Sequence, residues 1–260
     1  MSIDVKNLSF AYRQNEVLRD ISFTANKGEF IALLGPNGTG KTTLFRCILG
    51  FLKGYDGQIL CDGTDIKNAS AREMARHMAY IPQSGALVFN HTVMGMVLMG
   101  TTGQKSVLGT PGRKQTEIAE AALQKLGIES LADRGCQELS GGETQLVLIA
   151  RAVAQGATAL IMDEPAASLD LGNRYRVLSL ARSLSREGYT VLMSLHDPDQ
   201  ALVFADRAIM LHKGQIIADG EASSVITEKL ILDIYGVSVK ISNSDSGGKG
   251  IIFSAPDEKL

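Results

Sequence analysis

A glycine-rich loop between an apolar strand pattern and a helical pattern is the feature that most limits how this chain can fold. Residues 30–34 are uniformly apolar, the loop reads Gly-Pro-Asn-Gly-Thr-Gly-Lys-Thr over 35–42, and apolar residues then recur at helical spacing to Leu52. A strand, such a loop and a helix in this order are typical of a phosphate-binding loop in an α/β fold. A glycine turn that only starts an amphipathic helix is the alternative, and the complete order argues against it.

The residue types of this phosphate loop suit a nucleotide. Glycine backbones can aim successive N–H groups inward, and the start of the following helix adds its positive end. Lys41 supplies a cation for the β- and γ-phosphates, and the Thr42 hydroxyl suits a magnesium ion. We expect the nucleotide to be bound by Gly35, Pro36, Asn37, Gly38, Thr39, Gly40, Lys41, Thr42 and Thr43.

Two adjacent carboxylates follow another apolar strand pattern. Residues 159–162 read Ala-Leu-Ile-Met, and Asp163, Glu164 and Pro165 come directly after them. Ligands of an open parallel sheet lie just beyond the carboxyl ends of its strands, so both carboxylates are expected beside the phosphates. Asp163 is placed to hold magnesium through its water shell, and Glu164 to orient or deprotonate an attacking water. Capping of the next helix is the structural alternative.

Composition excludes several other classes of protein. The 260 residues are 45% apolar and 21% charged with a formal net charge of −2, so no overall basic field favours nucleic acid or an anionic membrane. Cys47, Cys61 and Cys136 lack metal-ligand spacing and are expected to be reduced, mostly buried thiols. The N-terminus does not read as a signal peptide, and no apolar run approaches the roughly 20 residues that cross a bilayer. Any membrane role therefore needs a different chain.

The pattern along the chain indicates an α/β core with an inserted helical lobe. Short apolar strands alternate with helices before and after residues 85–155, which indicates a mainly parallel sheet covered on both faces. Within 85–155, helices are expected over 114–126, ended by Gly127, and from Glu143 onward. We therefore divide the chain into a core of 1–84 and 156–238, a helical lobe of 85–155 and a C-terminal extension of 239–260 that is partly mobile.

Leu139-Ser140-Gly141-Gly142-Glu143, at the start of that second helix, repeats the physical logic of the phosphate loop. A hydroxyl, exposed backbone N–H groups and a helix N-terminus form a second anion site. With this signature loop added, the chain resembles the ATP-binding subunits of ABC transporters over nearly its whole length. The resemblance implies an α/β fold, with a P-loop NTPase (RecA-like) core and mainly parallel sheet, an N-terminal antiparallel β subdomain and an inserted α-helical lobe. It also implies ATP and Mg²⁺ as cofactors.

Further family elements are found in order along the chain. By resemblance, Tyr12 stacks on adenine, Gln83 reaches magnesium and the attacking water, and His196 contacts the γ-phosphate. Asp170 lies in the loop that crosses the dimer seam in the family. Each of these alone could be an ordinary packing, loop or surface residue, and only their order carries the argument. The implied catalytic residues are Glu164, His196, Gln83 and Lys41, the implied metal-binding residues are Thr42, Gln83 and Asp163, and the implied nucleotide-binding residues include Ser140, Gly141, Gly142 and Asp170.

The resemblance also implies a partner. In the family, the signature loop faces the γ-phosphate held by the phosphate loop of a second subunit, so ATP joins two subunits in a sandwich. A second copy of this chain is therefore expected. ATP favours the closed dimer because the γ-phosphate contacts exist only there.

Two positions depart from the commonest family pattern. Glu143 stands where glutamine is usual, which adds negative charge near the nucleotide although the helix dipole favours a carboxylate there. Leu146 stands where many relatives have arginine. Residues 167–173 and 194–198 look like the ATPases of iron-chelate, haem and cobalamin importers, in which the helical lobe docks a short helix of a membrane subunit. Residues 93–99 could serve there or be plain core.

The leading hypothesis is thus the ATP-hydrolysing subunit of an importer, attached through integral membrane permease subunits to the cytoplasmic side of the cell membrane, and indirectly served by a substrate-binding protein. The alternatives are another ABC transporter with a different cargo or an exporter, and a soluble ABC ATPase that acts on ribosomes or DNA. A module that binds ATP without turnover is a further reading, against which Lys41, Asp163, Glu164 and His196 argue. No nucleic acid partner is expected.

Overall fold

Two β-sheets, a group of helices and a C-terminal hairpin make up the part of the chain that the computed structural model describes, which is residues 1–83, 91–104, 112–243 and 249–253. The larger sheet has the strand order β10-β9-β3-β8-β7-β6 and is parallel except for β10. Its strands are β3 (Phe30–Leu34), β6 (Met78–Ile81), β7 (Ala159–Asp163), β8 (Thr190–Ser194), β9 (Arg207–His212) and β10 (Gln215–Glu221).

The central strands of this sheet are buried on both faces. Every residue of β3, β7 and β8 is buried, as the uniformly apolar patterns predict. Because these strands are parallel, their carboxyl ends meet at one edge. The register pairs Asp163 with Ser194 there, and the phosphate loop leaves β3 at the same edge.

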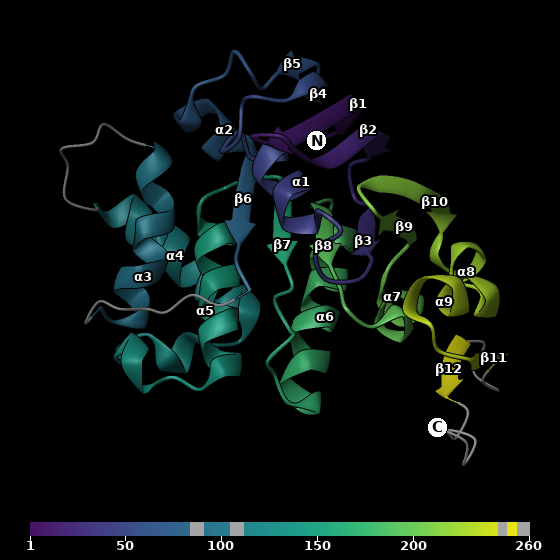
Figure 1. Cartoon of the computed structure of the whole chain (residues 1–260). Coiled ribbons are helices and arrows are strands. Elements are labelled where there is room, and N and C mark those ends of the chain that lie inside the picture. The colour runs from purple at the N-terminus through teal and green to yellow at the C-terminus, as the bar shows by residue number, and fades with distance from the viewer. Residues whose placement is uncertain (84–90, 105–111, 244–248, 254–260) are drawn as a thin grey trace.

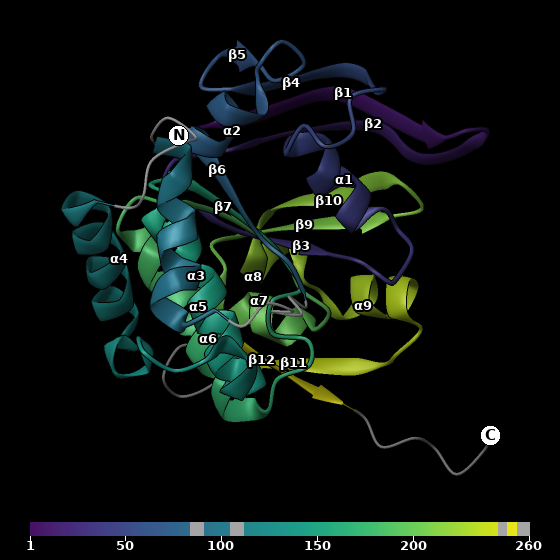
Figure 2. The same ribbon diagram turned by 90° about the vertical axis from the view of Figure 1, so that its left-hand side faces the viewer.

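The smaller sheet is antiparallel and lies over one face of the larger one (Figures 1 and 2). A core cluster between the sheets joins apolar side chains of the small sheet to Leu44 and Phe45 of the first helix and to Ile31 and Leu33 of β3. The strand order is β2-β1-β4-β5, with strands β1 (Ile3–Tyr12), β2 (Asn15–Ala25), β4 (Asp56–Cys61) and β5 (Thr64–Asp65).

Strand β2 was not predicted from the sequence because its alternation of buried and exposed residues is broken. Its exposed residues include the adjacent pair Arg19 and Asp20, and Asp20 has a φ of 49° beside a register shift in the pairing with β1. An irregularity of this kind shifts which residues face the core, so a strict period of two fails.

The described residues also form helices. They are α1 (Lys41–Ile48), α2 (Ala71–His77), α3 (Val93–Gly100), α4 (Arg113–Leu126), α5 (Gly141–Ala154), α6 (Leu171–Arg186), α7 (Pro198–Phe204), α8 (Ala222–Val225) and α9 (Glu228–Tyr235), with short 3₁₀ helices η1 (Thr101–Gln104), η2 (Glu129–Leu131) and η3 (Cys136–Glu138). The helix expected to end at Gly127 does so, and that glycine has a left-handed φ of 64°.

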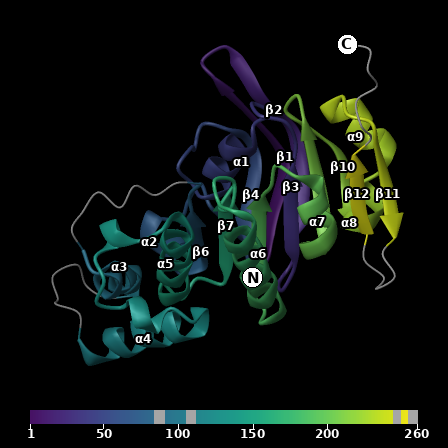
Figure 3. The same cartoon turned by 90° about the horizontal axis from the view of Figure 1, so that it is seen from below.

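Helices α3, α4 and α5 pack together beside the β6 edge of the large sheet (Figures 1 and 3). The predicted fold class is confirmed by the two sheets and this group of helices. The boundaries 85 and 155 of the helical lobe stay a prediction, and residues 84–90 and 105–111 of that region lie outside the described residues.

The C-terminal extension contains an unexpected hairpin at the opposite side of the molecule from the lobe (Figure 3). Strands β11 (Val239–Asn243) and β12 (Lys249–Phe253) pair in antiparallel fashion and contact α9 and α7. Val239 is buried in the main core cluster. The expectation of a partly mobile extension also covers residues 244–248 and 254–260, which lie outside the described residues.

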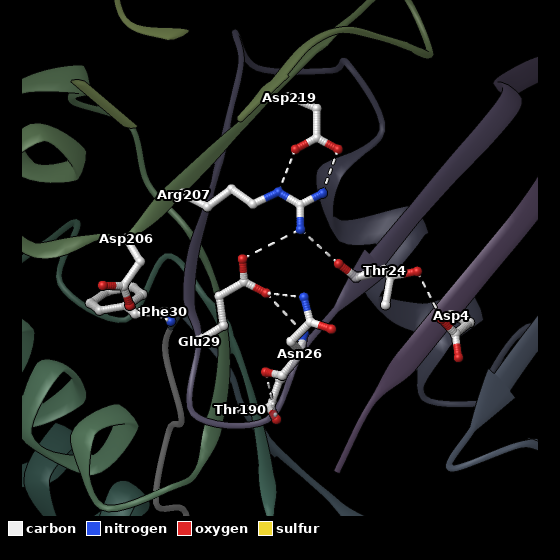
Figure 4. A network of polar contacts seen from close by, with 9 residues as sticks. All are labelled: Asp4, Thr24, Asn26, Glu29, Phe30, Thr190, Asp206, Arg207 and Asp219. Carbon is white, nitrogen blue, oxygen red and sulfur yellow. Dashed lines mark hydrogen bonds and ion pairs between the residues drawn. The ribbon is translucent and has the colours of Figure 1, made fainter. Parts of the chain in front are cut away.

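A polar network around Arg207 fixes the start of β3 (Figure 4). Its guanidinium donates to both carboxylate oxygens of Asp219 at 2.5 and 2.7 Å and to the carbonyl oxygen of Thr24 at 2.8 Å. The neighbouring Asp206 carboxylate accepts from the backbone N–H of Phe30 at 3.0 Å. Because bidentate arginine pairs are geometrically specific, the network fixes the position of the start of β3, the strand that leads into the phosphate loop.

The three cysteines are buried free thiols, as expected. Burial raises the pKa of Cys47 to about 12 and that of Cys61 to about 11. Within the described residues, no helix is both long and apolar enough to cross a bilayer.

Candidate nucleotide-binding site

The phosphate loop is shaped by backbone conformations that side chains would obstruct. A Cβ on Gly35, whose φ is 147°, would lie 2.2 Å from the carbonyl oxygen of Leu211. A Cβ on Gly38 would meet nothing within 4 Å, so the loop there faces open space. Helix α1 follows with Gly40 as its N-cap, no side-chain cap and no carboxylate in its first turn. The first N–H groups of α1 are therefore left for an external anion.

Lys41 lies at the centre of this loop and is only 5% exposed. Its ammonium donates to the carbonyl oxygens of Gly35 at 2.7 Å and Pro36 at 3.3 Å, and lies 3.5 Å from the Glu164 carboxylate. Burial lowers the pKa of Lys41, and the Glu164 carboxylate opposes that shift. The loop thus holds the cation against its own backbone, where phosphate oxygens can replace those contacts. Thr39 supports the turn by donating to the Pro36 carbonyl at 2.9 Å.

Ser194 organises the acidic pair, although no sequence motif indicated this role. The Ser194 hydroxyl donates to Asp163 Oδ1 at 2.8 Å and accepts the backbone N–H of Glu164 at 2.8 Å. Glu164 has a left-handed φ of 48°, which turns it away from the strand direction. His196 Nε2 lies 2.5 Å from Glu164 Oε2. The carboxylate that would meet a water is therefore oriented by its backbone and by His196.

His196 directly precedes the N-cap of α7. Asp197 takes the N-cap position and Pro198 lies in the first turn, but the Asp197 side chain does not cap the helix. It instead accepts from Gln200 Nε2 at 2.6 Å and lies 3.5 Å from a guanidinium nitrogen of Arg174. The turn that presents His196 is thus held by contacts of the Asp197 side chain.

A cavity of about 420 Å³ brings half of the predicted site residues together. It also includes Val17, which no motif indicated. Its lining is Val17, Asn37, Gly38, Gly40, Lys41, Thr42, Thr43, Gln83, Glu164 and His196. The lining does not include Tyr12, Ser140, Gly141, Gly142 or Asp170.

The oxygen atoms near this cavity suit a magnesium ion. Thr42 and Gln83 are exposed in its lining. Asp163 is buried outside the lining, next to Glu164 in the chain, and its second oxygen accepts from the Tyr80 hydroxyl at 3.5 Å. Mg²⁺ prefers oxygen ligands and keeps several waters, so few protein groups suffice. Among the described residues, no group of three or more histidine, cysteine or acidic side chains is arranged to hold a metal ion.

Tyr12 lies at the end of β1 and is 42% exposed. Its ring meets Phe10 edge to face, with centroids 4.9 Å apart. An exposed ring held by a neighbour can stack on a base, and this role stays a prediction.

The signature loop is a capped helix N-terminus. Ser140 is the N-cap of α5: its hydroxyl accepts from the N–H of Glu143 at 3.3 Å, and Glu143 Oε2 accepts from the N–H of Ser140 at 2.8 Å. These two bonds form a capping box. The Ser140 bonds, together with Arg134, lower the pKa of Glu143. The unusual glutamate therefore has a structural role, and Leu146, only 1% exposed, belongs to the core.

Asp170 lies beside the signature loop rather than in the cavity. It is the N-cap of α6 and accepts from the backbone and side-chain N–H groups of Asn173 at 2.9 and 2.7 Å. A Cβ on Gly142 would lie 2.4 Å from Asn173 Cγ, so Gly142 permits this close packing. Ser140 and Gly141 stay exposed. The two sets of groups that the sequence predicts to bind anions thus do not share one cavity.

Comparison with known proteins agrees with this geometry. A family model described as ABC transporter matches residues 18–167. An ABC transporter ATP-binding protein of Haemophilus influenzae is 37% identical over 241 residues, which cover 93% of this chain and 92% of that protein. A hemin import ATP-binding protein of Rhizobium etli is 32% identical over 260 residues, with 97% of each covered.

Solved structures give the same result. A proposed metal-chelate type ABC transporter in an inward-facing conformation is 28% identical, with a TM-score of 0.86 and 98% of each chain covered. A phosphate loop, an acidic pair and the signature loop occur together here in a chain that matches the family over more than half its length. The chain belongs to the ABC transporter family, as an ATP-binding and ATP-hydrolysing subunit of a transporter.

Proposed function

We propose that two copies of this chain close around ATP, with the phosphate loop of each copy facing the signature loop of the other. The observation that carries the proposal is the separation of the two sets of anion-binding groups. Ser140 and Gly141 are exposed at the start of α5 and are absent from the lining of the 420 Å³ cavity. A second copy would supply them to the open side of that cavity, which makes a composite site.

In this composite site, Glu164 accepts a proton from the water that attacks the γ-phosphate. His196, 2.5 Å from that carboxylate, orients it and contacts the phosphate. Lys41 exchanges its carbonyl partners for phosphate oxygens and balances their charge. Thr42, Gln83 and Asp163 would hold Mg²⁺, which when bound adds further positive charge beside the phosphates.

The partner on the membrane side is proposed to be a pair of integral permease subunits. A groove of about 490 Å³ runs between the ends of α1, α2, α3 and α5. Phe51 and Met99 in its lining are 64% and 42% exposed, which fits a surface that an apolar helix covers. We infer that a short permease helix enters this groove and holds the chain at the cytoplasmic side of the membrane. A substrate-binding protein would act on the far side.

Import of an iron chelate, haem or a cobalamin-type substrate is the proposed transport activity. It is supported by the named role of the Rhizobium etli relative and by the metal-chelate type of the structural neighbour. Uptake of such substrates by cells with and without this chain, together with the permease that co-purifies with it, would test the cargo.

Mixed dimers test the composite site directly. A Lys41→Ala subunit paired with a Ser140→Arg subunit keeps one intact site if the signature loop acts on the other copy. A subunit carrying both changes, paired with a wild-type subunit, then keeps none. We expect ATP hydrolysis of about half the wild-type rate in the first dimer and almost none in the second. The reverse order would mean that each chain uses its own signature loop and would refute the proposal.

A further inference from the structure

Arg134 lies in the segment between η2 and η3 and points at the start of α5. One guanidinium nitrogen donates to Glu143 Oε1 at 2.9 Å, and another donates to the backbone carbonyl of Glu138 at 2.7 Å. Both side chains of the ion pair are partly shielded from solvent. Arg134 therefore bonds to both ends of the signature loop: to Glu138, the residue before it, and to Glu143, its last residue.

The backbone of Arg134 is itself fixed to the helical lobe. Its carbonyl accepts from the N–H of Val93, the first residue of α3, at 2.9 Å, and its N–H donates to Leu131 at 3.0 Å. The next residue, Gly135, forms a β-bridge with Thr92. The guanidinium thus projects from a rigid base, which a flexible surface arginine would lack.

Glu143 divides its carboxylate between two tasks. Oε2 accepts from the N–H of Ser140, while Oε1 accepts from Arg134. The carboxylate closes the cap of α5, but it also puts a negative charge in the first turn of a helix that is proposed to receive a phosphate. A charge in that position repels an anion unless an opposite charge lies close by. Arg134 is the cation that meets it.

We propose that Arg134 is a positioning residue of the composite ATP site, which holds the Glu143 carboxylate in the Ser140 cap and balances its charge where the γ-phosphate of the other copy arrives. This inference rests on the proposed function, since it needs the signature loop to meet a phosphate. It also explains the departure at residue 143: the glutamate is compatible with the site because an arginine nine residues earlier neutralises it.

Variants that neutralise one or both of these charges test the proposal. Arg134→Gln leaves Glu143 unbalanced and is expected to raise the ATP concentration for half-maximal hydrolysis by about tenfold. Glu143→Gln leaves Arg134 unbalanced and is expected to lower that concentration by about twofold. In the double variant both charges are gone, and the value returns to within about threefold of wild type. Hydrolysis by the full chain is measured over a range of ATP concentrations.

Two further variants make the result specific. Arg134→Lys keeps the charge but not the two-sided bonding, so it should shift the concentration by less than about threefold. Arg113→Gln removes the exposed Arg113–Glu117 pair of α4 in the same lobe and should change nothing. Thermal unfolding of each variant verifies that the chain is folded.

Two outcomes would overturn the inference. If Arg134→Gln behaves like Arg113→Gln, the arginine has no role in the site. If the double variant is as impaired as Arg134→Gln alone, the arginine acts only through its bond to Glu138 and not by balancing Glu143. Ser140→Arg separates this from the proposed function: normal hydrolysis in that variant refutes the composite site, whereas loss of hydrolysis there with a normal Arg134→Gln refutes the Arg134 inference alone.

Discussion

The starts of α1 and α5 are both proposed anion sites, but they are built in opposite ways. Helix α1 begins after Gly40 with no side-chain cap and no carboxylate in its first turn. Helix α5 begins after Ser140 with a complete capping box, and its carboxylate belongs to Glu143. One helix start leaves its N–H groups open for a ligand, and the other supplies acceptors of its own.

The difference in capping fits the states of assembly in which each helix start is proposed to bind phosphate. The phosphate loop is proposed to hold a nucleotide whether or not a second copy is present, so the ligand would satisfy its open N–H groups. The signature loop is proposed to meet phosphate only in the closed dimer, and in the separated chain its backbone needs other partners. The Glu143 carboxylate supplies one, at the cost of a charge that Arg134 balances.

The largest expected effect leaves both helix starts intact and removes only the base. Glu164→Gln keeps the shape of the side chain but cannot take up the proton, so ATP hydrolysis should fall by about a thousandfold. ATP binding should persist, and because the γ-phosphate stays in place, the dimer should persist with it. Hydrolysis rates and size-exclusion chromatography with ATP measure both. Normal turnover would mean that Glu164 is not the base.

The start of α1 and its phosphate loop could be predicted from the sequence, because all their groups lie in one short segment. The strand and the loop occur where the sequence predicts them, and the helix begins at Lys41 as expected but ends at Ile48 rather than near Leu52. The acidic pair was also predictable, since Asp163 ends an apolar strand. Local pattern is sufficient when the chemistry is contained in a single strand, turn and helix.

The supporting side chains could not be predicted, because they come from distant segments. Ser194 reaches Asp163 through the pairing of β7 with β8, which the sequence does not specify. Arg134 reaches Glu143 only after the segment before α5 folds back onto α3. A polar residue at the end of an apolar strand and an unusual glutamate were the available signals, and neither identified its partner.

A smaller effect separates capping from ligand binding. Ser140→Ala removes the cap of α5 and should cost ~1 kcal/mol of the free energy of unfolding. It should also lower ATP hydrolysis by about a hundredfold, because a donor aimed at the phosphate is lost. Ser70→Ala is the matched control, since Ser70 and Glu73 form the same capping box at α2. It should cost a similar ~1 kcal/mol and leave hydrolysis unchanged. Equal hydrolysis in the two variants would reduce Ser140 to a cap.

The smallest expected effect concerns acid. Hydrogen bonds from Ser140, and then Arg134, lower the pKa of Glu143, and hydrogen bonds from Ser70 lower that of Glu73. A carboxylate with a lowered folded-state pKa contributes stability that is fully present above its unfolded pKa. That contribution is lost as the pH falls through the folded value. The stability difference between the wild type and Glu143→Gln should therefore shrink in this acid range, and Glu73→Gln should behave alike.

Denaturant unfolding between about pH 6 and about pH 3 measures these differences. The two variants should differ only in hydrolysis, measured at neutral pH. There Glu143→Gln changes the dependence of the rate on ATP concentration and Glu73→Gln does not. If both leave the ATP dependence unchanged while their acid responses match, the two boxes are equivalent caps. The start of α5 would then differ from that of α1 in its capping alone, and the charge at residue 143 would have no bearing on the nucleotide.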